Sequence, residues 1–111
     1  MSAININLIV EQGADYDVDF TIRNDDGSPL NLTGYNAASV MRKTYTSTKS
    51  YPFDVTFIDR LAGEISISMG RTDTASLREG RYVYDIVLSS PQSIKTRVIQ
   101  GNILVYPGVT L

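Results

Sequence analysis

The chain has 111 residues, of which 42% are hydrophobic, 20% charged and 9% aromatic, a size and composition that fit one compact globular domain. It contains no cysteine and no histidine, which excludes disulfide frameworks, thiol and imidazole catalysis, and the common zinc and haem ligand sets. Ten Lys and Arg residues against twelve Asp and Glu residues give a net charge of -2, so the chain lacks the basic excess that binding to nucleic acid requires.

The sequence carries no pattern of membrane insertion or secretion. No apolar run approaches the ~18 residues of a spanning helix. Residues 1–5 lack the basic region and the long apolar stretch of a signal peptide. We therefore expect a soluble protein that is made in a cytoplasm and has no membrane partner.

Two strands are predicted before the first turn. Apolar residues at even positions of the segment 4–10 share one parity and predict a strand that ends at residues 11–13. Residues 16–23 alternate apolar and polar side chains without error, as a strand with one buried face requires. The segment 24–29 then predicts a turn, because Gly27 can adopt a positive φ.

The middle of the chain predicts three more strands. Residues 37–42 form the first, and their small side chains suggest close packing. The segment 43–50 has almost no aliphatic content and predicts a long exposed loop or hairpin tip. Residues 53–57 and 65–69 both alternate, and the turn at 59–63 between them predicts a hairpin.

One short helix and two further strands are predicted in the last third. Residues 72–80 begin with capping residues and end in glycine, which predicts a connecting helix of about two turns. The segment 81–90 alternates strongly, and 94–100 returns beside it. Gly101 is expected to form a bend or bulge before a last apolar run at 103–106.

Seven to eight short strands with frequent turns and one connecting helix are typical of an all-β antiparallel sandwich. A small barrel is the competing architecture. The chain has no internal repeat and no low-complexity tract, so we expect residues 1–111 to form a single β-sandwich domain.

The motifs also follow one another in a recognisable order through nearly the whole chain. They are residues 11–13, 25–35, 41–42, 63–68, 80–86, 97–105 and 109–110. In this order they resemble a domain recurrent in structural proteins of tailed bacteriophages, similar to the amino-terminal domain of phage baseplate upper proteins. The resemblance implies an immunoglobulin-like β-sandwich and a protein that holds particles together or attaches fibres. The turn at 89–93 departs from the family pattern, because it lacks the glycine often found there.

We therefore expect a non-enzymatic bacteriophage virion structural protein, made in the host cytoplasm, that serves as an assembly component of the tail, baseplate or neck. Its partners would be other virion proteins, contacted in a symmetric multi-copy assembly. Two alternatives stay open: a capsid decoration protein, and a carbohydrate- or receptor-binding module of the virion. An enzyme using carboxylates is a distant third, and no catalytic residue, cofactor or metal is predicted.

The loop at 43–50 supplies the candidate partner contacts, which are Lys43, Tyr45, Lys49 and Tyr51. Charge, hydroxyl groups and tyrosines together are typical of adaptable binding loops, in which Tyr offers a large contact area at low entropic cost. A mobile hairpin tip explains the same composition equally well.

Three carboxylates at alternate positions, Asp15, Asp17 and Asp19, fall on one face of a predicted strand. Calcium prefers several carboxylate oxygens, so this face is a candidate calcium site. A solvated strand face is the better explanation, because a strand spaces such side chains ~7 Å apart whereas a calcium loop folds around its ion.

Asp85 interrupts an apolar strand. We expect it to pair with Arg97 or Lys95 across a hairpin, a contact between opposite charges on facing strands. A catalytic carboxylate is the alternative, although no second acid or base lies near it in the sequence.

The two ends of the chain give a further hypothesis. Residues 1–10 are apolar enough to add a strand to a neighbouring sheet, and residues 105–111 end on an apolar leucine. Small assembly proteins often bind their neighbours by such strand addition.

Overall fold

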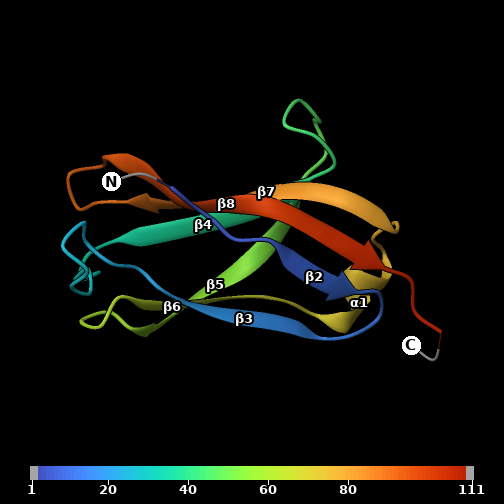
Figure 1. Ribbon diagram of the computed structural model, residues 1–111, viewed down its shortest axis with the longest axis horizontal. Helices are drawn as coiled ribbons and strands as arrows, with labels where there is room; N and C mark the ends of the chain where they lie inside the picture. The colour runs from blue at the N-terminus through green and yellow to red at the C-terminus, as the bar shows by residue number, and fades with distance from the viewer. Residues whose placement is uncertain (1–2, 110–111) are drawn as a thin grey trace.

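The computed structural model describes residues 3–109, and these form a mostly β protein with eight strands and one short helix (Figure 1). The elements are β1 (Ile4–Asn5), β2 (Leu8–Glu11), β3 (Tyr16–Thr21), β4 (Asn36–Arg42), β5 (Tyr51–Asp59), β6 (Glu64–Met69), α1 (Arg71–Ala75), β7 (Gly80–Ser89) and β8 (Lys95–Tyr106). Within this span, no helix has the length and apolar content needed to cross a membrane.

All strands belong to one strongly curled sheet with the order β1-β8-β7-β4-β5-β6-β3, and β2 also pairs with β8. The sheet curls at β5, because residues 51–53 pair with β4 whereas residues 54–59 pair with β6. The result is a half-barrel rather than a clear pair of separate sheets. β1 and β2 run parallel to β8, so the sheet is mixed and the expectation of a purely antiparallel fold is wrong.

The predicted strand faces are confirmed, and their inward side chains share one core. On β7, the residues Tyr82, Tyr84, Ile86 and Leu88 are buried, and they alternate with outward residues. Ile65, Ile67 and Met69 of β6, Phe20 of β3 and Phe53 of β5 are buried in the same cluster. Complete burial of one such side chain contributes roughly 1.5–3 kcal/mol, so alternation alone drives the sheet to close around this core.

The amino-terminal strand is interrupted, contrary to the prediction of one continuous strand. It divides into β1 and β2 at Ile6 and Asn7. The side-chain Oδ1 of Asn7 accepts a hydrogen bond from the Asn102 N–H at 3.0 Å. Gly101 lies in continuous register within β8, and a Cβ there would overlap the carbonyl oxygen of Ile6. Gly101 thus permits a close backbone approach and forms no bulge. The register shift between β7 and β8 lies instead between Ile86 and Val87 of β7.

The helix is confirmed as a connector but is shorter than the predicted segment 72–80, with α1 spanning Arg71–Ala75. The chain leaves the helix because Leu77 is drawn into the core, where it is 2% exposed. The Tyr82 hydroxyl then holds the next residue, accepting a hydrogen bond from Arg78 N at 3.1 Å and donating one to Arg78 O at 2.9 Å. The predicted capping residues do not set the start of α1, because the helix begins directly after Gly70 and no side chain caps it.

Candidate functional site

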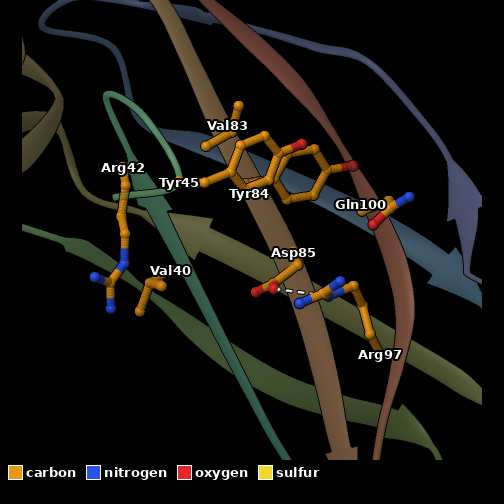
Figure 2. A pocket seen from close by; sticks show the side chains of 8 residues that line it. All are labelled: Val40, Arg42, Tyr45, Val83, Tyr84, Asp85, Arg97 and Gln100. Carbon is orange, nitrogen blue, oxygen red and sulfur yellow. Dashed lines mark hydrogen bonds and ion pairs between the residues drawn. The ribbon is translucent and has the colours of Figure 1, made fainter. Parts of the chain in front are cut away.

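An open depression of about 390 Å³ lies on the outer surface of β4, β7 and β8 (Figure 2). Outward side chains of the three strands form it, because side chains alternate between the two faces of a sheet. The loop between β4 and β5 adds one tyrosine. The lining residues are Val40, Arg42, Tyr45, Val83, Tyr84, Asp85, Arg97 and Gln100.

An ion pair crosses this depression from β7 to β8. Arg97 Nε donates a hydrogen bond to Asp85 Oδ2 at 3.0 Å, which confirms the predicted pairing of Asp85 and identifies Arg97 rather than Lys95 as the partner. Both side chains remain partly exposed, Arg97 by 54% and Asp85 by 30%. The carboxylate therefore has a structural partner at the surface, which accounts for its place in an apolar strand.

Arg42 connects the depression to the loop. Its Nη1 donates a hydrogen bond to the carbonyl oxygen of Ser47 at 2.8 Å. Inside the loop, Ser47 N donates to Thr44 O at 3.2 Å, and Thr44 N donates to Ser47 Oγ at 3.1 Å. These bonds close a compact turn that presents Tyr45, whose side chain is 77% exposed.

The four predicted contact residues separate into two groups. Lys43 Nζ lies 4.7 Å from the ring centre of Tyr82, and Lys49 Nζ lies 5.2 Å from that of Tyr51. The two rings meet edge to face with centroids 5.9 Å apart. Lys43, Lys49 and Tyr51 thus surround a buried ring at the base of the loop, whereas Tyr45 alone of the four lines the depression.

Sequence reasoning missed Arg42, Val40, Val83 and Gln100 as neighbours of Tyr45. Their only sequence signal is an outward position on a strand, which the three strands share with many other residues. The register aligns them, because Asp85 stands opposite Val40 on one side and Gln100 on the other.

The three carboxylates of the calcium hypothesis do not converge. Asp15 is engaged at the start of α1, where its Oδ1 accepts a hydrogen bond from Arg71 N at 2.9 Å and its Oδ2 lies 3.3 Å from Arg71 Nη2. Asp17 and Asp19 are exposed on β3. Among residues 3–109, no group of three or more His, Cys, Asp or Glu side chains has the arrangement of a metal site.

The described part of the amino-terminal segment is already paired within its own sheet, because β1 and β2 both lie along β8. Strand addition to a neighbour would have to break this pairing or use its free edge. A groove of about 520 Å³ does lie beside that edge, between Ile4 and Ile6 on one side and Phe20 of β3 on the other. Residues 1–2 and 110–111, which also enter the strand-addition hypothesis and the family pattern, lie outside the described residues.

Comparisons with known proteins found no matching family model and no matching curated protein. Among solved structures, the chain is similar to part of an internalin-like protein of Listeria monocytogenes, with 11% identity, a TM-score of 0.44, and coverage of 96% of this chain and 28% of that one. It is also similar to part of a family 123 glycoside hydrolase from Clostridium perfringens, with 11% identity, a TM-score of 0.40, and coverage of 96% and 23%. The chain thus spans about a quarter of the length of these proteins. Likenesses at these scores carry no functional information.

Proposed function

We propose that this chain is a non-enzymatic virion structural protein of a tailed bacteriophage, an assembly component of the tail, baseplate or neck. The order of its motifs supports the phage assignment. The outer surface of β4, β7 and β8 supports the mode of action, because it combines an exposed tyrosine with partly exposed arginines, residue types enriched where proteins meet. That surface is the observation on which the proposal depends.

We further propose that the curled sheet is a form of the immunoglobulin-like sandwich. In this interpretation β3, β6 and the second part of β5 make one layer, and β4, β7 and β8 make the other, with β5 shared between them. A shared strand leaves the outer surface of each layer open for contact with other subunits.

The test is incorporation into particles. The chain should copurify with intact virions at a fixed ratio to the other tail proteins, as measured by quantitative mass spectrometry. Replacing Tyr45 by Ala should lower incorporation severalfold without changing stability, because the ring is exposed and its truncation leaves the core intact. Leu61→Ala is the control, since Leu61 is 70% exposed in the turn between β5 and β6, away from this surface.

Particles that contain none of the chain, although infected cells produce it, would refute the proposal. A capsid decoration protein is the nearest alternative, and fractionation of particles into heads and tails distinguishes the two roles. It would remain with isolated heads, whereas a tail, baseplate or neck component would remain with isolated tails or with the head–tail junction.

A carbohydrate-binding role is the second candidate, favoured by the exposed Tyr45 ring beside the polar groups of Asp85, Arg97 and Gln100. If this role is right, the isolated protein should bind monosaccharides at this site. Titration with neutral and acidic sugars would then move the amide NMR signals of β7 and β8 in the wild type but not in Tyr45→Ala. Unchanged spectra at millimolar sugar would exclude this role and leave the assembly role intact.

A further inference from the structure

The outer surface of β3, β5 and β6 carries negative charge and no positive charge at its outward strand positions. We call this surface the acidic face. Register aligns its residues across the strands, with Asp17 and Asp54 both opposite Ser68, and Asp19 opposite Ser66. Its outward residues are Asp17, Asp19 and Thr21 of β3, Asp54, Thr56, Ile58 and Asp59 of β5, and Glu64, Ser66 and Ser68 of β6.

The outer surface of β4, β7 and β8, which we call the basic face, has the opposite charge. Arg42, Arg81, Lys95 and Arg97 point outward there, and Asp85 is the one acid among the outward residues of these three strands, already paired with Arg97. Register spreads the cations over the whole face, because Lys95 stands opposite Ser89 at one end of β7 and Arg81 lies near the other end.

The two faces look away from each other, because the inward residues of both layers belong to one core. Figure 1 shows β3 and β6 along the lower side of the molecule and β7 and β8 along the upper side. The strand positions give five acids on one face, and four bases with one acid on the other. Charge is thus separated across a chain whose net charge is only -2.

We propose that the acidic face of one copy docks on the basic face of a second copy. Contact between two different surfaces of the same chain is heterologous, so it leaves one acidic and one basic face unused and repeats into a ring or a fibre. This proposal rests on the proposed assembly function and names the partner, which is another copy of this chain.

The expected contact is weak for a single pair. Three strands ~4.8 Å apart and six residues long at ~3.3 Å each make an acidic face of only a few hundred Å². Stable interfaces bury roughly 800 Å² per partner, so we expect a dissociation constant on the order of 0.1–1 mM. Repetition around a symmetric particle would strengthen such a contact.

Sedimentation velocity of the full chain tests the proposal. The wild type should associate with rising concentration at ~0.1 M salt, and association should weaken at least about tenfold at ~1 M salt, where the Debye length falls from ~10 Å to ~3 Å. Asp17→Lys with Asp19→Lys reduces the net charge of the acidic face from -5 to -1, and Arg81→Glu with Lys95→Glu changes that of the basic face from +3 to -1. Each double variant alone should associate at least about tenfold more weakly than the wild type, because one of its two faces has lost most or all of the charge that attracts the other.

An equimolar mixture of the two double variants should recover association as one-to-one pairs, because the unaltered basic face of the first meets the unaltered acidic face of the second. The matched control is Asp25→Lys with Glu79→Lys, which raises the net charge by the same four units as Asp17→Lys with Asp19→Lys, at two exposed residues outside the strands of both faces. It should associate like the wild type. All these sites are exposed, and circular dichroism verifies that each variant is folded.

The proposal is overturned if the wild type stays monomeric to 1 mM, if the reversals leave association unchanged, or if the mixture fails to recover it. A control that loses association with the others would assign the effect to net charge and overturn it as well. The assembly function fails by a different measurement, namely absence from purified particles, so the two can be judged separately.

Discussion

The phenolic oxygen of Tyr84 donates a hydrogen bond to the carbonyl oxygen of Ile6 at 2.7 Å, joining two residues that are 78 positions apart. Tyr84 is 4% exposed and Ile6 is partly buried, so the bond lies at the edge of the core. The amide of Ile6 donates in turn to the carbonyl oxygen of Gln100 at 2.9 Å. Ile6, which lies between β1 and β2, is therefore bonded to β7 through the Tyr84 side chain and to β8 through the backbone of Gln100.

Replacing Tyr84 by Phe should lower the free energy of unfolding by about 1–2 kcal/mol, because the partly buried carbonyl group of Ile6 loses its hydrogen-bond donor. Urea denaturation measures the change. Tyr106→Phe is the control, since Tyr106 is exposed on β8 and should leave stability unchanged. Equal stability of Tyr84→Phe and the wild type would show that the bond contributes nothing.

Stability should fall as the pH rises above about 10. Burial raises the pKa of Tyr84, Tyr82 and Tyr16. Negative charge nearby raises the pKa further in two cases, from Tyr16 for Tyr84 and from Asp17 for Tyr16. The unfolded chain then loses these protons at a lower pH than the folded chain, so the stabilisation is complete below the unfolded pKa of ~10 and is lost above it. Each tyrosine adds a slope of up to about 1.4 kcal/mol per pH unit.

Chemical denaturation at a series of alkaline pH values measures this slope. Tyr84→Phe should show a shallower decline than the wild type, because it has one fewer buried tyrosine to titrate. Parallel curves for the two proteins would contradict the assignment of Tyr84.

Adding a methyl group at Gly101 should destabilise the fold by roughly 1–3 kcal/mol, since the new Cβ would overlap the backbone of Ile6 and force it away from β8. Gly70→Ala is the matched control, because a Cβ there meets nothing within 4 Å and φ is an ordinary -72°. Hydrogen exchange at the Ile6 amide should accelerate in Gly101→Ala and not in Gly70→Ala. Unchanged exchange in both variants would refute the close approach.

The turn after β7 contains a strained residue in place of the expected glycine. Ser93 has a φ of 65°, and among residues 3–109 it is the one non-glycine residue with a positive φ. Ser93→Gly should raise the free energy of unfolding by about 0.5–1 kcal/mol, because glycine adopts this conformation without a clash of its Cβ. Thermal unfolding measures this gain in stability, and a Tm of Ser93→Gly below that of the wild type would contradict the presence of strain at Ser93.

The pair of Asp85 and Arg97 should contribute little to stability despite its short distance. Partly exposed ion pairs typically contribute ~0.2–1 kcal/mol and are screened by salt. A double-mutant cycle with Asp85→Asn and Arg97→Gln should give a coupling energy in that range that declines at high salt. A coupling of several kcal/mol, insensitive to salt, would show instead that the pair is buried from solvent.

Several features of the fold follow directly from the order of residues. Strict alternation in the segments 16–23 and 81–90 determined both the strands and the faces they bury, because the period of a strand is a local property. The same holds for the hairpin around residues 59–63 and for the existence of a helix after residue 70. A partner for Asp85 on the returning strand, Arg97 or Lys95, could be expected in advance because a hairpin keeps partners near each other along the chain, whereas the fold selected Arg97.

Contacts between distant segments were decided only in the folded chain. Alternation is the same in parallel and antiparallel strands, so it carried no sign that β1 and β2 run parallel to β8 or that one part of β5 pairs with β4 and the other with β6. The separation of acidic and basic faces likewise depends on which strands become neighbours. The physical reason is that local geometry sets which way a side chain points, whereas closure of the core sets what it meets.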